Sequence, residues 1–325
     1  MIFKTVLFAI IALFGIPLIL AGYIYSTDKI VKNIRSKIRE KISPWFWLSP
    51  AFILMFVFLL YPVINTVILS LMSSNSREFI GLENYSYILT DNSMLIALKN
   101  NLLWLVFVSL ITVTLGLLIA VLTDRVRYEA VAKALIFLPM AISFVAAGVI
   151  WKFMYQYQPK GTPQTGTVNA ILTSVNASFE PQAWLFNPAY NNWALMIVGI
   201  WMWTGFCVVI LSAGLKSIPH TLVEAARIDG AGEVKIFFKI ILPIMKSTIL
   251  VVLTTIVINI LKIFDIVYIM TNGTLGTEVI ANRMYKEMFN FRNFGRASAI
   301  AVILLLAIIP FILINLKRFR RKDGI

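Results

Sequence analysis

The sequence predicts an all-α integral membrane protein, a polytopic helical bundle of about seven transmembrane helices. Hydrophobic residues make up 59% of its 325 residues and charged residues only 14%, more apolar surface than a soluble core can bury. The apolar residues also occur in runs of about 20, the length of a helix that crosses a bilayer. Basic residues gather between these runs, which is typical of membrane proteins oriented by positive charge.

Seven runs have the length and composition of spans: residues 6–25, 46–71, 102–122, 134–155, 193–215, 247–270 and 297–316. The first run could instead be a signal peptide. However, only Lys4 precedes it as a basic residue and many basic residues follow it, which is the wrong flank pattern for a cleaved signal. We therefore expect it to be a retained anchor.

The basic segments predict the topology. After the first run come Lys29, Lys32, Arg35, Lys37, Arg39 and Lys41, against Asp28 and Glu40. This excess places the segment in the cytoplasm and the amino terminus outside. Counting spans from there, the basic segments 124–133 (with Arg125), 216–246 and 317–322 also fall inside, so the carboxyl terminus is cytoplasmic. The outward loops are 72–99, 156–192 and 271–296.

Composition also limits the domains and the chemistry. We expect an extra transmembrane anchor with a basic cytoplasmic linker at 1–45, and one transmembrane domain at 46–325. The net charge of +14 does not indicate nucleic-acid binding, because the basic residues lie in short segments beside apolar runs. With a single cysteine, Cys207, and a single histidine, His220, the chain has no intrachain disulfide and no metal site that needs two such ligands.

The segment between the fifth and sixth runs predicts a helix, a break and a second helix. Pro219 suits a first helical turn, and Gly230 suits the left-handed residue that closes a helix. Beyond it, apolar residues recur at helical spacing and indicate a short amphipathic element at the cytoplasmic surface: Val234, Phe237, Phe238 and Ile241. Thr221 and Glu224 could form a capping box, or Ser217 could cap the helix. Either makes the segment a well-capped interfacial hairpin.

The same segment carries a resemblance to a known family. The run Glu224-Ala225-Ala226, followed by Gly230 and by Ile240-x-Leu242-Pro243, resembles the EAA signature of permease subunits in bacterial ATP-binding-cassette (ABC) importers. Its flanks, which contain Ile218-Pro219 and Asp229, resemble the carbohydrate branch of maltose and multiple-sugar type. From residue 46 onward the spacing of the runs also fits that family, whose permeases have the type I importer fold and lie in the bacterial inner membrane.

The resemblance implies roles and partners. The coupling loop at 216–246 would dock on a separate ATPase subunit through Glu224, Ala225, Ala226, Asp229 and Gly230. The implied partners are a second permease subunit, two ATPase subunits, an extracytoplasmic sugar-binding protein and the lipid bilayer. This chain would need no cofactor, because the ATPase subunits bind ATP and magnesium. Accordingly, no Gly-rich loop ending in Gly-Lys-Ser/Thr is present.

Two outer segments extend the resemblance. Residues 264–273 resemble the end of the sixth span of sugar permeases, which usually continues with Gly-Gly-Pro. This chain has Gly273-Thr274-Leu275-Gly276 there, so its outer loop is expected to differ. Residues 276–285 resemble the α-glucoside branch, which suggests an α-glucoside oligosaccharide as the substrate.

A polar stripe in the sixth run suggests a substrate pathway. Lys262 and Asp265 are three residues apart and would share a helix face, where ionisable groups are costly and are paired or face a polar cavity. A mutual ion pair and a pathway role both remain open. Asn259 and Tyr268 would extend the stripe, and Trp203 of the fifth run would supply an aromatic platform for a sugar ring.

The sequence therefore favours a non-catalytic translocation subunit of an importer. One alternative is a membrane-embedded enzyme, although no paired histidines and no cluster of carboxylates at membrane depth support it. The other is an ion-driven secondary transporter, for which a repeated half would be expected; no clear repeat is seen.

Overall fold

The computed structural model describes residues 2–34, 36–124 and 126–322, so the predicted cytoplasmic residues Arg35 and Arg125 lie outside it. Every regular element in these ranges is a helix, which confirms the predicted all-α class. By its contacts the chain separates into two units, Met1–Asn65 and Thr66–Ile325. The functional boundary after residue 45 remains a prediction.

The first unit is a helical hairpin. Its helices are α1 (Ile2–Lys32) and α2 (Ser36–Met55), and α2 continues through the π-helix η1 (Phe56–Leu60) into α3 (Tyr61–Leu69). The Tyr23 hydroxyl of α1 hydrogen-bonds to α2 at the Phe46 carbonyl and, at 2.8 Å, at Ser49 Oγ. The helix Ser36–Leu69 contains an 18-residue window with a mean hydropathy of 2.5, enough for it to cross a bilayer.

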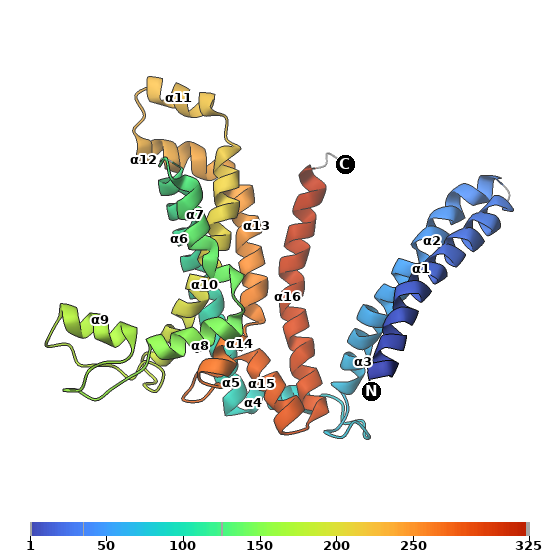
Figure 1. Cartoon of the computed structure of the whole chain (residues 1–325), viewed down its shortest axis with the longest axis horizontal. Coiled ribbons are helices and arrows are strands. Elements are labelled where there is room, and N and C mark those ends of the chain that lie inside the picture. Colours follow the sequence, from blue (N-terminus) through green and yellow to red (C-terminus); the bar gives the residue numbers. More distant parts are fainter. Residues whose placement is uncertain (1, 35, 125, 323–325) are drawn as a thin grey trace. The chain divides into compact units, whose positions relative to one another are not determined.

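Four further helices of the second unit are long and apolar enough to cross a bilayer (Figure 1). The first joins α5 (Asn92–Leu103), η2 (Trp104–Val108) and α6 (Ser109–Thr123), and the second is α10 (Asn191–Lys216). The third joins α12 (Glu233–Ile236), η4 (Phe237–Ile241) and α13 (Leu242–Leu261), and the fourth is α16 (Phe294–Lys322).

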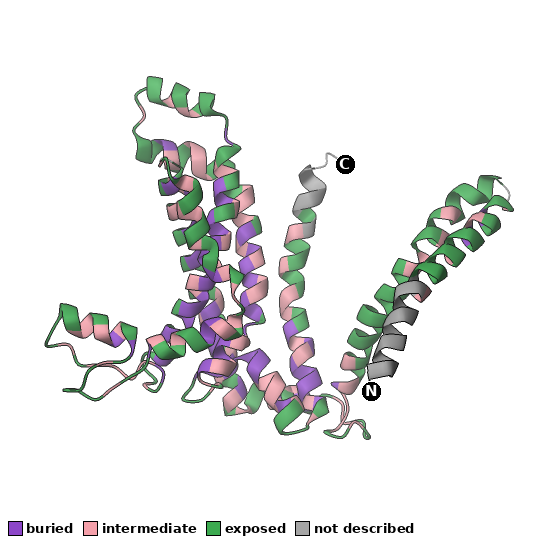
Figure 2. Ribbon diagram, viewed as in Figure 1, coloured by how far each residue is buried: buried purple, intermediate pink, exposed green. Residues whose placement is uncertain are grey.

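Helix α10 is the centre of the bundle. It packs on both α6 and α13, and buried residues concentrate along it (Figure 2). A Cβ atom at Gly116 of α6 would lie 2.4 Å from Cys207 Cβ of α10. Glycine is therefore required where these two helices approach most closely.

The predicted fourth span is broken. It consists of α7 (Glu129–Phe137) with the 3₁₀ turn η3 (Leu138–Ala141), and then α8 (Phe144–Met154), which is bent away by 99°. Pro139 lies in the 3₁₀ turn, and Ser143 caps α8 by accepting a hydrogen bond from Ala146 N at 3.1 Å. With this pair the described helices supply up to six spans. Half of the side chains of the first run, 6–25, lie outside the described residues, so a seventh span and the orientation remain predictions.

The predicted sixth span is also broken, contrary to the expectation of one helix over 247–270. Helix α13 ends at Leu261, and α14 (Asp265–Met270) begins after a break. Phe264, at φ −140° and ψ −61°, is not helical. Helix α14 instead packs on α8, where a Cβ atom at Gly148 would lie 3.1 Å from Ile269 Cγ2.

Short helices occupy the two ends of this unit. Near α8 and α14 lie α4 (Glu83–Thr90), α9 (Thr167–Val175), α15 (Ile280–Tyr285) and η5 (Lys286–Asn290). Helix α11 (His220–Ile228) lies at the opposite end, beyond α12 (Figure 1).

Candidate functional site

The predicted coupling loop forms an isolated surface helix, α11. Every residue of α11 is at least partly exposed. Glu224 and Ala225 are exposed, and Ala226 is half-buried. Apolar side chains are exposed beside them: Ile228 is 86% exposed and Leu222 47%. An exposed short helix with apolar side chains is suited to packing against another protein.

The end of α11 is defined by its backbone. Gly230 has φ +77°, as its sequence position predicts. The Gly230 amide donates to the Arg227 carbonyl at 3.0 Å and the Ala231 amide to the Ala226 carbonyl at 2.9 Å, which is a Schellman motif with Asp229 as the C-cap. An Arg227 Nε–Glu233 Oε1 ion pair of 2.8 Å then ties α11 to α12.

Both predicted helix caps are wrong. The N-cap of α11 is Pro219, which makes no side-chain hydrogen bond, and Thr221 lies inside the helix. Ser217 Oγ instead donates backwards to the Gly214 carbonyl at 2.7 Å, at the end of α10. Because Pro219 occupies the cap position itself, neither Thr221 nor Ser217 can fill it. Glu224 is thus left without a capping role.

The predicted short amphipathic element is also different. Val234, Phe237, Phe238 and Ile241 belong to the first turns of the long helix Glu233–Leu261 rather than to a separate element. Val234 and Phe238 are 73% and 61% exposed. A cavity of about 260 Å³ lies beneath α11, lined by residues of α6, α10, α11 and α12.

A larger cavity of about 510 Å³ lies at the opposite end of the unit. It lies among the end of α8, the segment after it, α14 and the turn that follows α14. Its lining mixes aromatic rings with polar groups: Lys152, Tyr155, Gln156, Tyr157, Leu185, Phe186, Tyr268, Ile269, Met270, Thr271, Asn272, Thr274 and Leu275. Such a mixed lining can stack on apolar sugar faces and bind hydroxyl groups.

Of the predicted polar stripe, Tyr268 lines this cavity and the other members do not. Lys262 is exposed at the C-cap of α13 and Asp265 begins α14, so the break prevents them from sharing one helix face. Within the described residues no ion pair joins them, and the mutual-pair interpretation is wrong. Asn259 Nδ2 donates to the Thr255 carbonyl at 2.9 Å.

Trp203, the predicted aromatic platform, lies in the middle of α10. Its ring packs 5.7 Å from the ring of Phe144, the first residue of α8, and 6.0 Å from that of Phe206. The structure thus places Tyr268 at the cavity. Trp203 lies beside the start of α8, and the other predicted pathway residues lie around the break between α13 and α14: Asn259, Lys262 and Asp265.

Comparison with known proteins decides the family. The family of binding-protein-dependent transport system inner membrane components matches residues 112–320. The chain belongs to this family. The permease is therefore a multi-pass inner-membrane protein, which confirms the predicted localisation.

Individual relatives agree over nearly the full length. The permease is 56% identical to the osmoprotective compounds uptake permease protein GgtC of Synechocystis sp., over 85% of this chain and 99% of the relative. It is 43% identical to the alpha-glucoside transport system permease protein AglF of Rhizobium meliloti, over 97% and 98%. These relatives are permease subunits, as expected.

A solved structure shows the same fold. A chain of a bacterial ABC transporter involved in the import of the acidic polysaccharide alginate superposes with a TM-score of 0.74 at 22% identity. The match covers 88% of this chain and 99% of that chain. The predicted importer-permease fold is thereby confirmed.

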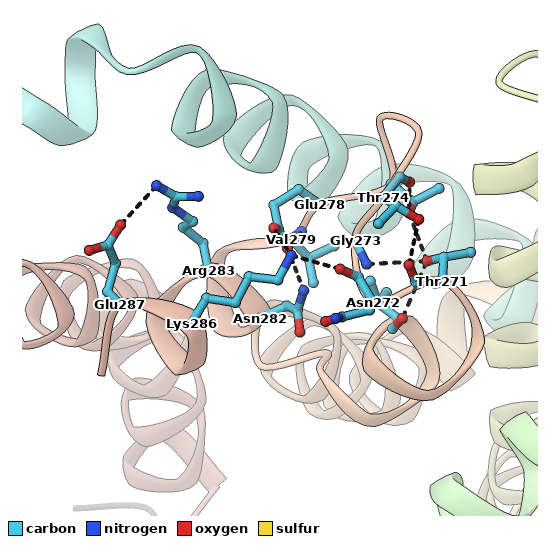
Figure 3. Close-up of polar contacts among 12 residues, drawn as sticks. Thr271, Asn272, Gly273, Thr274, Glu278, Val279, Asn282, Arg283, Lys286 and Glu287 are labelled. Atoms are coloured by element: carbon cyan, nitrogen blue, oxygen red, sulfur yellow. Dashed lines mark hydrogen bonds and ion pairs between the residues drawn. The ribbon is translucent and has the colours of Figure 1, made fainter. Parts of the chain in front are cut away.

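The permease also contains a buried polar network that the sequence analysis missed (Figure 3). Lys286 Nζ donates at 2.7 Å both to Glu278 Oε2 and to the Asn272 carbonyl, and Asn282 Nδ2 donates to Glu278 Oε1 at 2.5 Å. Glu278 and Asn282 are 5% and 0% exposed. The spacing 278, 282, 286, one helical turn each, is the sequence signal that could have revealed it.

Asparagine side chains hydrogen-bond to the turn that follows α14, which forms part of the cavity wall. Asn100 Nδ2 donates to the carbonyls of Gly276 and Glu278 at 2.7 and 2.8 Å, and Asn191 Nδ2 donates to the Leu275 carbonyl at 2.9 Å. Leu275 and Gly276 have positive φ, +53° and +80°. The surrounding bonds thus hold a strained backbone in one conformation.

A second buried pair lies beside this network. Arg283 Nη2 pairs with Glu287 Oε1 at 2.8 Å and also bonds to the Tyr87 hydroxyl of α4. Burial raises the pKa of Tyr87 to about 12, so the phenol stays neutral and donates to Glu287 Oε1 at 3.0 Å. Helix α4 is therefore joined to α15 and η5 by charge-assisted bonds.

Proposed function

We propose that this permease is the non-catalytic translocation subunit of an ATP-driven importer that takes up a carbohydrate delivered by an extracytoplasmic binding protein. The observation that carries the proposal is the exposed α11, which presents the EAA residues outward at the end of the bundle. The family implies the remaining machinery: a second permease subunit and two ATPase subunits that bind ATP and magnesium.

In the proposed docking, Glu224 offers its carboxylate to a basic side chain of the ATPase subunit. Ala225 and Ala226 allow close approach because their side chains are short. Asp229 and Gly230 set the turn that directs the chain back to α12. The absence of a capping bond from Glu224 supports this assignment, since its carboxylate remains available.

In the proposed pathway, a sugar enters the cavity of about 510 Å³ and stacks on Tyr268. Asn259, Lys262 and Asp265 then act around the break between α13 and α14. Trp203 supplies an apolar ring face at the start of α8. The mixed aromatic and polar lining supports a sugar rather than a purely apolar substrate.

The proposed substrate class is an α-glucoside oligosaccharide. The 43% identical relative bears an alpha-glucoside name, and residues 276–285, which resemble that branch, directly follow Leu275, the last residue that lines the cavity. A second candidate is an osmoprotective solute, because the 56% identical relative is named for osmoprotective compounds.

The experiment is uptake into proteoliposomes that contain the complete transporter and its binding protein. Labelled maltose, sucrose and the non-sugar osmoprotectant glycine betaine are compared with and without internal ATP. ATP-dependent uptake of the two α-glucosides is expected, and glycine betaine alone would support the second candidate. Uptake that needs an ion gradient instead of ATP would refute the importer proposal.

A further inference from the structure

A second cavity, of about 380 Å³, lies beside the proposed sugar cavity and shares only Tyr155 with it. Its walls come from α8, α9, the segment between α9 and α10, and the first turns of α10. The lining is apolar and largely aromatic: Trp151, Tyr155, Val168, Trp184, Tyr190, Trp193, Ala194 and Ile197. Several rings are in contact, with centroids 5.1 Å apart for Trp151 and Tyr155 and 6.2 Å apart for Tyr155 and Trp184.

Two of the lining rings use their polar atoms for hydrogen bonds within the protein. The Tyr155 hydroxyl donates to the Ala194 carbonyl at 3.1 Å, and Trp184 Nε1 donates to Asn169 Oδ1 at 3.0 Å. Trp151 Nε1 is buried and makes no hydrogen bond within the described residues. A sugar carries many hydroxyl groups and would lose the hydration of most of them here without gaining hydrogen bonds, whereas a hydrocarbon chain would lose nothing.

The groove reaches exposed apolar residues of a helix that can span the membrane. Trp193 and Ile197 lie one turn apart on α10 and are 45% and 49% exposed, and α10 is long and apolar enough to cross the bilayer. Phe107, 37% exposed, packs edge-on against Trp193 at 5.0 Å. Tryptophan and tyrosine rings collect at the bilayer interface, and this wall extends from there about 6 Å into the hydrocarbon.

We infer that the groove binds one acyl chain of a membrane lipid. The chain enters from the bilayer along Trp193 and Ile197 and packs against Val168 of α9. The segment that closes the groove also supplies Leu185 and Phe186 to the neighbouring cavity. A bound lipid therefore contacts the segment that also forms one wall of the proposed sugar cavity. The lipid composition of the membrane then affects the geometry of that wall.

The test uses the complete transporter in nanodiscs of phosphatidylcholine whose acyl chain carries a terminal diazirine. After illumination, the labelled peptides are identified by mass spectrometry. We expect labelling between residues 167 and 197. Val168→Trp fills the groove and lowers this labelling about tenfold, the effect of displacing about two methylene groups. Ile197→Asn lowers it by placing an amide in the entrance.

The matched control is Val209→Trp, on α10 at a position 39% exposed and outside the groove, which should label like the unmodified protein. Size-exclusion profiles confirm that each variant assembles. Unchanged labelling in Val168→Trp would show ordinary surface contact and overturn the proposal, as would no labelling of the unmodified protein. If Val168→Trp kept its lipid labelling but lost stimulation of ATP hydrolysis by the binding protein, the groove would instead be a protein-docking site.

Discussion

The two ends of the second unit are built in opposite ways. At one end, α11 is exposed along its length and is defined by a single turn at Gly230 and one ion pair to α12. At the other end, the turn after α14 is fixed by buried charges and by asparagine side chains from α5 and α10. The comparison indicates that the end proposed for docking keeps its side chains exposed, whereas the cavity end is held by bonds within the chain.

The largest expected effect comes from removing the buried ion pair at the cavity end. Glu278→Ala leaves Lys286, whose side chain is 15% exposed, without its carboxylate in a buried site. The expected cost is about 3–5 kcal/mol of stability, measured as a lower thermal midpoint and a loss of assembled transporter. The matched control is Lys160→Ala, in an ion pair whose side chains are 67% and 71% exposed. Equal loss in both variants would show that the buried network does not stabilise this end.

The second effect is at the docking end. Gly230→Val places a β-branched residue at φ +77°, at a local cost of about 1–3 kcal/mol. We expect loss of ATPase retention on membranes and of transport, with an unchanged thermal midpoint because α11 carries no core contacts. Gly232→Ala is the control, since its φ of −69° suits alanine and its Cβ meets no neighbour. Full ATPase retention by Gly230→Val would contradict the docking role.

A smaller effect separates docking from capping. Glu224→Ala should reduce ATPase retention and sugar-stimulated ATP hydrolysis about tenfold, through loss of one hydrogen bond to a charged group, while the permease keeps its stability. Thr221→Ala, the other half of the predicted capping box, should change neither property. A fall of about 0.5–2 kcal/mol in stability for either variant would restore the capping interpretation.

A still smaller effect is expected in the pathway. Asp265→Ala and Asn259→Leu should each lower sugar uptake a few-fold, as expected for the loss of one hydrogen bond of about 0.5–1.5 kcal/mol. Both variants should still assemble, since neither residue joins α13 to α14. Uptake kinetics in proteoliposomes provide the measurement, and normal uptake by both would remove these residues from the pathway.

The last test determines the membrane orientation with cysteine substitutions, which are expected to leave transport unchanged. Thr167→Cys, in α9, should react with an impermeant thiol reagent from outside the inner membrane, whereas Lys37→Cys and Lys235→Cys should not. The native Cys207 is buried and should give little background. An unreactive cysteine at 167 would reverse the assignment of the two ends.

Sequence patterns located the spans well where a span is formed by one continuous helix. The runs 102–122 and 193–215 lie inside the helices Asn92–Thr123 and Asn191–Lys216. Gly230 was also predictable, because a left-handed helix end is a local requirement. The break at 262–264 was not, since it contains neither proline nor glycine and arises where α14 packs on Gly148 of α8. The capping box failed because Pro219, rather than Thr221, occupies the cap.

The buried polar network shows the same limit of local patterns. Glu278, Asn282 and Lys286 are spaced for contact, but the backbone at 275–278 is also bonded by Asn100 and Asn191 from distant parts of the chain. Tyr268 was predicted as an extension of the polar stripe, a local signal, and it does line the cavity. The helix break then determined which of its neighbours reached the cavity.

The uninterrupted helix Glu233–Leu261 has a mechanical consequence. Its 29 residues span about 44 Å, more than the roughly 30 Å hydrocarbon core of a bilayer. One end is tied to α11 through Arg227, and the other ends at the break before Asp265. With α11 docked on the ATPase subunit as proposed, a displacement of α11 would pass along this continuous helix to the break beside α14. The fourth span, bent by 99°, is not continuous in this way.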